Sequence, residues 1–327
     1  MNDRIRWGIL GTGKIARKFA EGLSALPDAD LTAVGSRAAD TAHAFADAFN
    51  VPNRHAGYDA LADDPDVDIV YVATPHTFHR ENSILCLNGG KAVLCEKPFT
   101  INRREAGEVI ALAREKGLFL MEAMWTRFLP IIAKIRDWLS EGAIGDVQVV
   151  TADFGGRARF DPESRLFNPD LGGGALLDLG VYTVSFASMV FDRQPSRIAS
   201  LAHIGETHID EQSGMLFAYD QGQLALLYST IRAGTPQSAQ ILGSEGAIQI
   251  HPSFWRATAA TLTTGGSEQT LELPYAGNGY TCEAAEAMRC LREGRKESDT
   301  MPLDETLAVM GTLDRVREQW GLRYPME

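Results

Sequence analysis

Short apolar runs recur through the first 125 residues, and each is followed by a stretch of helical character. Strands that are covered on both faces read as continuous apolar runs, so this pattern predicts a parallel sheet between layers of helix. The first 124 residues are therefore expected to form a Rossmann-type α/β domain. The expected strands are residues 5–10, 31–37, 67–75, 91–98 and 118–125, with a short extended piece near 54–58.

A glycine-rich segment, GTGKIA, directly follows the first expected strand. Gly11, Gly13 and Ala16 have the G-x-G-x-x-G/A spacing, in which the first glycine allows a tight turn and the second lets the backbone approach a pyrophosphate. A glycine-rich turn occurs in many βα units, but its position after an N-terminal strand favours dinucleotide binding. The residues expected at the cofactor here are Gly11, Thr12, Gly13, Lys14 and Ile15.

The second expected strand ends in Ser36 and Arg37, where NAD-binding proteins usually carry an acidic residue for the ribose. A guanidinium can bind a 2′-phosphate through two hydrogen bonds, and no carboxylate at these two positions would repel it. This favours NADP, with NAD kept as the alternative because Asp40 lies nearby.

A charged pair, Glu96 and Lys97, ends the apolar run VLCEKP, and Pro98 stops that strand. Ligands of open α/β sheets bind beyond the carboxyl ends of the strands, so Lys97 is expected at a ligand site. Glu96 is expected to anchor Lys97 or the local backbone, or to contact the cofactor. The neighbouring strand end supplies four further candidates for cofactor contact, Thr74, Pro75, His76 and His79.

The pattern changes near residue 125, so the second domain is expected to span residues 125–327, with its last helices able to pack back on the first domain. Longer alternating strands at 147–155, 214–231 and 238–251, with turns at 220–222 and 244–246, predict a mostly antiparallel open sheet. The apolar stretch 171–191 predicts a helix, in which Asp178 and Tyr182 are four residues apart and share a face.

Four more residues are candidates for the site. Trp125 and Arg127 lie at the expected domain junction, where they would bound the nicotinamide end of a crevice, and Trp125, Phe154 and Arg157 would line the substrate side. Interface packing and surface charge explain these residues equally well, because ligand pockets are themselves mostly apolar.

Composition excludes several other classes. The formal net charge of the 327 residues is -12 without a basic run, which argues against a nucleic-acid partner. No run reads as a signal peptide or membrane span, and Cys86, Cys95, Cys282 and Cys290 lack metal-ligand spacing. We expect no bound metal, because His76 and His79 have no third ligand nearby, and we expect a cytoplasmic protein with reduced thiols.

The segments GTGKIA, VATPHTFH, CEKP and GGGALLDLGVY together resemble the Gfo/Idh/MocA family of nicotinamide-dependent sugar and alcohol dehydrogenases over nearly the whole chain. MEAMWTRF and the ending LDRVREQWGLRYP are most similar to the dimeric dihydrodiol dehydrogenases and the NADP-linked D-xylose dehydrogenases. Many relatives place a histidine where Tyr182 stands, so the resemblance is to the tyrosine branch.

The resemblance implies that Lys97 and Tyr182 are the catalytic pair, supported by Asp178. Oxidation of a carbinol needs a base for the hydroxyl proton, and an ammonium beside a tyrosine would bring its pKa toward a useful value. Lys97, Asp178 and Tyr182 are also expected to contact the substrate, a D-xylose-like aldose or a trans-dihydrodiol.

Two further expectations concern the whole molecule. The alternative function is a non-catalytic NADP(H)-sensing regulator of the same fold. A one-sided antiparallel sheet needs a cover, which predicts a homodimer through the C-terminal sheet.

Overall fold

The computed structural model describes residues 4–327, and these fall into two compact units. The N-terminal unit comprises the residues up to Trp125 together with Ala276–Leu307, and the sheet unit comprises Thr126–Tyr275 and Ala308–Glu327. The first domain was expected to end at residue 124, and the first segment of the N-terminal unit ends at Trp125. Residues 276–307, which follow the main segment of the sheet unit in sequence, belong to the N-terminal unit.

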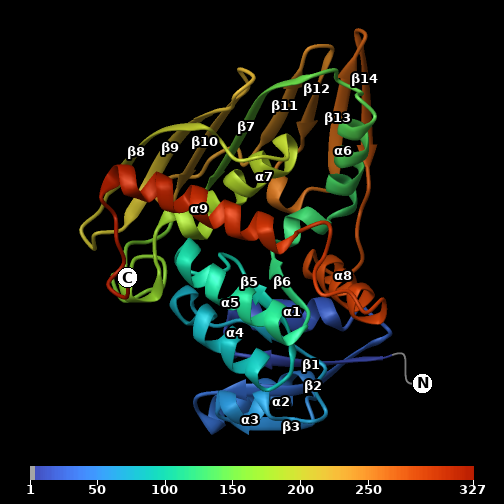
Figure 1. Ribbon diagram of the computed structural model, residues 1–327, viewed down its shortest axis with the longest axis vertical. Coiled ribbons are helices and arrows are strands. Elements are labelled where there is room, and N and C mark those ends of the chain that lie inside the picture. Colours follow the sequence, from blue (N-terminus) through green and yellow to red (C-terminus); the bar gives the residue numbers. More distant parts are fainter. Residues whose placement is uncertain (1–3) are drawn as a thin grey trace. The chain divides into compact units, whose positions relative to one another are not determined.

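The N-terminal unit is built on a six-stranded sheet with the order β3-β2-β1-β4-β5-β6, in which every pair is parallel (Figure 1). This is the strand order of the Rossmann fold, whose order reverses between β1 and β4. All residues of β4, β5 and β6 are buried, which explains their apolar sequences. The strands are β1 (Ile5–Leu10), β2 (Ala29–Ser36), β3 (Asn53–Ala56), β4 (Ile69–Val72), β5 (Ala92–Glu96) and β6 (Leu120–Ala123).

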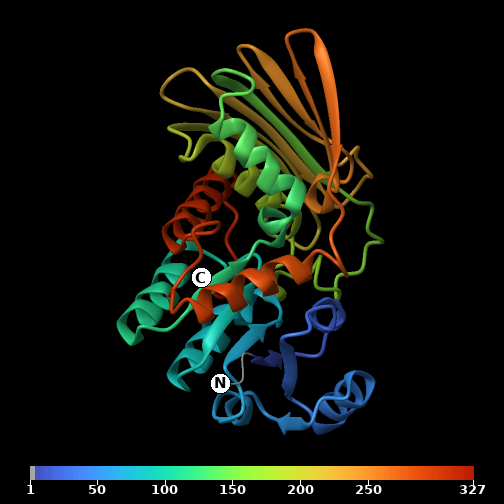
Figure 2. The same ribbon diagram turned by 90° about the vertical axis from the view of Figure 1, so that its right-hand side faces the viewer.

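Helices connect these strands and cover both sides of the sheet. Figure 2 shows α4 and α5 on one side and α1 on the other. Asn102 caps α5 by accepting the Glu105 N–H at 2.9 Å, and Gly117 ends that helix in a left-handed conformation, φ 62°. The helices are α1 (Lys14–Leu23), α2 (Ala39–Phe49), α3 (Tyr58–Ala62), η1 (His76–Phe78), α4 (His79–Asn88), α5 (Arg103–Lys116) and α8 (Tyr280–Arg292).

The sheet unit contains an eight-stranded sheet with the order β14-β13-β12-β11-β7-β10-β9-β8. All its pairs are antiparallel except β7 with β10, which run parallel. The strands are β7 (Val147–Gly155), β8 (Arg197–Ile204), β9 (Asp210–Ala218), β10 (Leu224–Thr230), β11 (Ala239–Gly243), β12 (Gly246–Ile250), β13 (Ala259–Thr264) and β14 (Ser267–Glu272).

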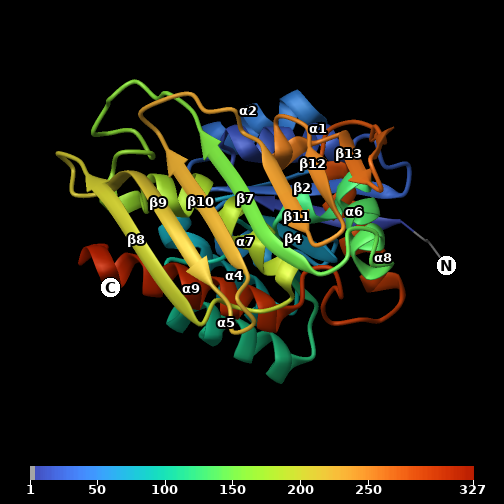
Figure 3. The same ribbon diagram turned by 90° about the horizontal axis from the view of Figure 1, so that it is seen from above.

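One face of this sheet is covered by α7, which lies behind β9, β10 and β7 when the sheet is viewed from above (Figure 3). The helical stretch Pro169–Phe191 is long and apolar enough to cross a membrane, but 83% of its apolar window is buried, as in the core helix of a soluble protein. The remaining helices are η2 (Trp125–Phe128), α6 (Pro130–Ser140), η3 (Pro169–Leu171), η4 (Leu176–Gly180), α7 (Val181–Phe191), η5 (Phe254–Arg256) and α9 (Leu303–Trp320).

The predicted fold class, a Rossmann domain followed by a mostly antiparallel sheet, is confirmed. Both predicted hairpins are present as β9–β10 and β11–β12. The predicted helix 171–191 is not a regular α-helix, because Leu176–Gly180 forms a π-helical turn before α7 begins. Sequence analysis did not identify β8, β13 or β14.

Candidate active site

The glycine-rich turn between β1 and α1 has the features of an anion site. Gly11 has φ +105°, and a Cβ added there would lie 2.9 Å from the carbonyl oxygen of Ala73, at the point where the strand order reverses. Gly13 is the N-cap residue just before α1, where no side chain caps the helix. A Cβ added to Gly13 would meet no atom within 4 Å among the described residues. The backbone N–H groups at this helix start suit a dinucleotide pyrophosphate.

The other predicted residues of this turn differ in exposure. Lys14 is exposed, whereas Thr12 and Ile15 are half-buried.

The end of β2 places Ser36 and Arg37 in different environments. Ser36 is buried and its hydroxyl lies 2.6 Å from that of Thr41, whereas Arg37 is exposed. The Arg37 guanidinium lies beside the Tyr58 hydroxyl and opposes the effect of burial, which raises the pKa of Tyr58. The Arg37 guanidinium, together with the hydroxyl groups of Ser36 and Tyr58, can bind a ribose phosphate at the end of β2.

Glu96 fixes the backbone that carries Lys97. One Glu96 oxygen accepts a hydrogen bond from the Tyr71 hydroxyl, and the other accepts the Lys97 N–H at 3.1 Å. Glu96 is buried and Lys97 is half-buried. These contacts are of the kind expected of a residue that anchors the local backbone, and the cofactor contact expected of Glu96 stays a prediction.

Further carboxyl groups are buried near Glu96. Glu122 on β6 and Glu283 on α8 have no exposed surface. Burial, followed by the charges of Glu96 and Glu122, raises the pKa of Glu283 well above its usual value. Burial and the neighbouring charges therefore favour the protonated form of Glu283.

His79 connects two strand ends through its imidazole ring. One ring nitrogen lies 2.8 Å from the Thr74 carbonyl oxygen after β4, and the other lies 2.8 Å from the Pro98 carbonyl oxygen after β5. The ring has no exposed surface, whereas His76 is 4% exposed and Pro75 is half-buried. His79 thus braces the loops at the carboxyl edge of the sheet, and direct cofactor contact by these histidines stays a prediction.

Trp125 and Arg127 fall in different units and are both buried. The Trp125 ring stacks on Tyr280 with 4.8 Å between centroids and packs so closely on Gly279 that a Cβ there would lie 2.0 Å from it. The Arg127 guanidinium donates to the hydroxyl and the carbonyl oxygen of Ser185, at 3.0 and 2.8 Å. Arg127 therefore holds α7 three residues beyond Tyr182, and the ligand contacts predicted for both residues stay predictions.

An aromatic cluster surrounds Tyr182 at the start of α7. The Phe154 ring meets the Tyr182 ring edge-on at 5.3 Å, and Trp255 stacks on Phe154 at 5.0 Å with the planes 10° apart. The structure thus brings together two predicted residues, Phe154 and Tyr182. Arg157 is exposed in the loop after β7.

Asp178 lies in the π-helical turn and pairs with Arg165, whose guanidinium donates to it at 2.9 Å. Because a π turn has more residues per turn than an α-helix, the simple four-residue spacing does not fix where Asp178 lies relative to Tyr182. π-helical turns are frequent at functional sites.

Sequence reasoning missed Arg165 and Trp255. Arg165 lies in a long irregular loop with no periodic signal, so nothing indicated its pairing with Asp178. Trp255 follows β12, and its large aromatic side chain at a strand end was a usable signal. Across residues 4–327 no cluster of three or more His, Cys, Asp or Glu side chains could hold a metal ion.

Family models match both parts of the chain. Residues 5–124 match the oxidoreductase family with an NAD-binding Rossmann fold, and residues 132–249 match the GFO/IDH/MocA C-terminal domain. The chain is 38% identical to the trans-1,2-dihydrobenzene-1,2-diol dehydrogenase of Xenopus tropicalis over 98% of this chain and 99% of that protein. The human enzyme of the same name is 36% identical over 99% of both chains.

A solved structure gives the same relationship. KijD10, a 3-ketoreductase from Actinomadura kijaniata crystallised with NADP and TDP-benzene, has a TM-score of 0.83 and 29% identity, covering 96% of this chain and 97% of its own. Variants of KijD10 with a lysine replaced by alanine and with a tyrosine replaced by phenylalanine have also been solved. With two matching domains and relatives that align end to end, this chain belongs to the GFO/IDH/MocA family and is an NAD(P)-dependent oxidoreductase.

Proposed function

We propose that this chain is an NADP-dependent dehydrogenase that oxidises a cyclic trans-diol or a related sugar, with Tyr182 and Lys97 as catalytic residues. The observation that carries the proposal is the cluster around Tyr182. A stacked aromatic pair, Phe154 and Trp255, provides a flat apolar wall next to an ionisable hydroxyl. Such a wall suits a six-membered ring, and the Asp178 carboxylate suits the hydroxyls that the ring carries.

The chemistry requires a group that takes the proton of the reacting hydroxyl while the hydride leaves its carbon. Bound NADP supplies the hydride acceptor. The Tyr182 oxygen takes the hydroxyl proton, the Lys97 ammonium stabilises the resulting phenolate, and Asp178 holds a neighbouring substrate hydroxyl. In the reverse direction the same tyrosine returns the proton to the carbonyl oxygen.

The relatives support the substrate class. The curated relatives are named for a dihydrodiol, and KijD10 is named for a ketone on a sugar. Solved KijD10 variants also alter one lysine and one tyrosine, the residue types proposed here. No comparison supports the non-catalytic regulator considered from the sequence.

The test measures reduced nicotinamide by absorbance with a panel of trans-dihydrodiols, aldoses and cyclic ketones. We expect Lys97→Ala and Tyr182→Phe to lower kcat by about 100-fold or more without unfolding the protein. Tyr219→Phe is the matched control, because Tyr219 is a buried tyrosine of the same unit that packs on Phe191. If turnover by Tyr182→Phe stays within a few-fold of wild type, the catalytic assignment is wrong.

We further propose that the sheet unit forms a homodimer through the sheet face that α7 does not cover. Leu201, Leu216, Leu226 and Tyr228 are 83%, 44%, 47% and 43% exposed. Strand register places them on one face, since Leu226 pairs with Leu216 and Gly214 pairs with both Leu201 and Tyr228. A contiguous apolar patch of this kind marks an interface, and a second copy of the same face would cover it.

Light scattering at micromolar concentration tests the dimer. We expect a dimer for the wild type and a monomer for Leu226→Glu, with Gln221→Glu at the β9–β10 turn as the control. A monomeric wild type would overturn the proposal.

A further inference from the structure

Two buried side chains, Asp210 and Tyr324, hydrogen-bond to the backbone of the Gly173–Leu176 turn that precedes Asp178. Asp210, the first residue of β9, accepts the Leu176 N–H at 2.7 Å and has no exposed surface. Tyr324, in the segment after α9, donates its hydroxyl to the Gly173 carbonyl oxygen at 2.7 Å and is 2% exposed. Both contacts act on the backbone that leads directly into the π-helical turn.

Gly174 shows how closely these two side chains approach the turn. Its φ is +121°, and a Cβ there would lie 2.4 Å from an Asp210 carboxylate oxygen and 3.3 Å from the Tyr324 hydroxyl. The Gly174 N–H also donates to the Leu166 carbonyl oxygen at 2.9 Å. The turn thereby holds the loop that carries Arg165, the partner of Asp178.

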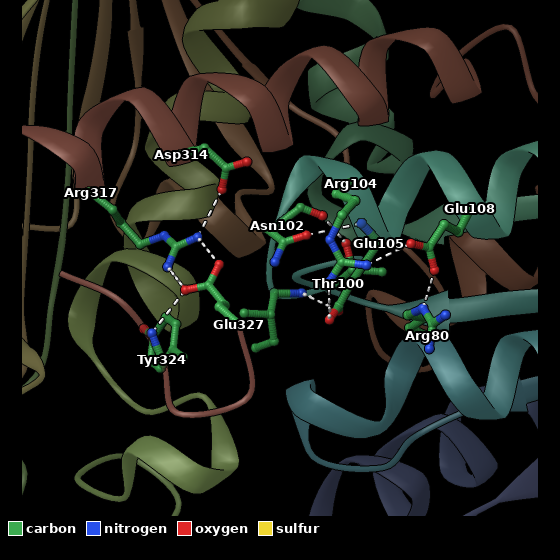
Figure 4. Close-up of polar contacts among 11 residues, drawn as sticks. Arg80, Thr100, Asn102, Arg104, Glu105, Glu108, Asp314, Arg317, Tyr324 and Glu327 are labelled. Carbon is green, nitrogen blue, oxygen red and sulfur yellow. Dashed lines mark hydrogen bonds and ion pairs between the residues drawn. The ribbon is translucent and has the colours of Figure 1, made fainter.

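An ion pair of the buried Arg317 keeps Tyr324 in place. The Arg317 guanidinium donates to both oxygens of Glu327, at 2.7 and 3.0 Å, and to Asp314 at 2.8 Å (Figure 4). Glu327 in turn accepts the Tyr324 N–H at 2.8 Å, and the guanidinium lies 5.1 Å from the centre of the Tyr324 ring. Arg317 is only 3% exposed, and its bidentate pair with the more exposed Glu327 fixes the segment 321–327.

We propose that Asp210 and Tyr324 are positioning residues, which fix the Gly173–Leu176 turn and through it the orientation of Asp178 and Tyr182 for catalysis. The inference rests on the proposed function, because it assumes that Asp178 and Tyr182 act on the substrate. Neither residue needs to touch the substrate, since small displacements of a reacting group are enough to slow catalysis severely.

The experiment compares single and double variants in the full-length protein. Tyr324→Phe removes one hydroxyl, and Asp210→Ala removes the acceptor of the Leu176 N–H. Asp210→Asn keeps a side-chain oxygen for that bond. We expect Tyr324→Phe and Asp210→Ala each to lower kcat by about tenfold, with the Kd for NADPH unchanged within about twofold because NADPH binds the N-terminal unit. Asp210→Asn should restore most of kcat.

A double variant separates positioning from a general loss of stability. If both residues act through one turn, Tyr324→Phe with Asp210→Ala should be little slower than either single variant, far from the product of the two losses. A merely structural role would lower the unfolding midpoint without this kcat pattern or the rescue by asparagine. If Asp210→Ala does not fold, Tyr324→Phe alone decides the question.

The outcomes distinguish the two proposals. If Tyr182→Phe is inactive while Tyr324→Phe and Asp210→Ala keep kcat within twofold of wild type, the positioning inference is wrong and the proposed function stands. If Tyr182→Phe keeps its turnover, the proposed function fails and the positioning inference fails with it.

Discussion

Gly11 and Gly13 flank the same turn but should respond in opposite ways to a methyl group. Gly11 has φ +105°, and its added Cβ would lie 2.9 Å from the Ala73 carbonyl oxygen. Gly13 has φ −71°, and its added Cβ would meet no described atom within 4 Å. Gly11→Ala therefore strains the folded protein, whereas Gly13→Ala places a methyl group in open space at the start of α1.

The expected magnitudes follow from these environments. Backbone strain at Gly11 costs about 1–3 kcal/mol and the contact with Ala73 adds to it, so the free energy of unfolding should fall by about 2 kcal/mol or more. Alanine at the Gly13 helix start costs at most about 1 kcal/mol. In the cofactor complex, however, that methyl group would block the approach of the pyrophosphate to the backbone. Loss of one charge-assisted hydrogen bond, about 1.5–3 kcal/mol, weakens NADPH binding about 10- to 100-fold.

Urea unfolding and NADPH titration, followed by tryptophan fluorescence, measure the two effects separately. Each variant is the control for the other, because Gly11→Ala should lose mainly stability and Gly13→Ala mainly affinity. An affinity of Gly13→Ala for NADPH within twofold of wild type would refute the placement of the pyrophosphate. A fully stable Gly11→Ala would refute the strain argument.

Three further predictions follow from single side chains. Arg37→Ala should raise the KM for NADPH about 10- to 100-fold, while the KM for NADH stays nearly constant. Steady-state kinetics with both cofactors test this. An equal rise in both KM values would contradict a contact between Arg37 and the 2′-phosphate. Burial raises the pKa of Asp210 from 3.8 to about 7, with the Leu176 N–H and Arg317 opposing the shift and Tyr324 as the other ionisable group that interacts with it. The folded protein then holds a proton that the unfolded chain releases between about pH 4 and pH 7, so the free energy of unfolding falls by about 1.4 kcal/mol per pH unit, about 4 kcal/mol in total, as the pH rises. Asp210→Asn should lack this slope in urea unfolding, and parallel curves for variant and wild type would exclude it. The raised pKa of Glu283 likewise contributes stability that is present in acid and is lost as the pH rises from the ordinary value of 4.5 toward the raised one. Glu283→Gln should stay within about 1 kcal/mol of wild type near pH 4 and become the more stable of the two as the pH rises to neutral, and a large loss of stability in the variant at neutral pH would show that Glu283 is ionised.

The order of elements was predictable from the sequence because burial leaves a direct trace in it. Buried strands such as β4 and β5 read as apolar runs, and the Gly11–Gly13 spacing marks the turn between β1 and α1. Strands β13 and β14 gave a weaker signal. β14 is mostly exposed and carries polar residues, so its composition resembles a loop.

Partners across long sequence distances were not predictable. Trp125 and Arg127 were identified as unusual residues, but the sequence does not say that Tyr280 and Ser185 are their neighbours. The same holds for Asp178, whose partner Arg165 lies in a loop without periodicity. The last helices were expected to be able to pack back on the first domain, but tertiary packing, which leaves no mark on local composition, decides which residues, 276–307, belong to the N-terminal unit.

The backbone around both proposed catalytic residues is held by buried carboxyl groups that act on N–H groups. Glu96 has partners for both oxygens, the Tyr71 hydroxyl and the Lys97 N–H, whereas Glu283 has no hydrogen-bond partner within residues 4–327. A buried charge needs hydrogen bonds, so the protonated form is favoured at Glu283, and Glu96 is the group that holds the Lys97 backbone. In the sheet unit, Asp210 likewise holds the main chain, because it accepts the Leu176 N–H just before Asp178. In each unit a buried carboxyl group thus holds the main chain next to a residue that we propose to be catalytic.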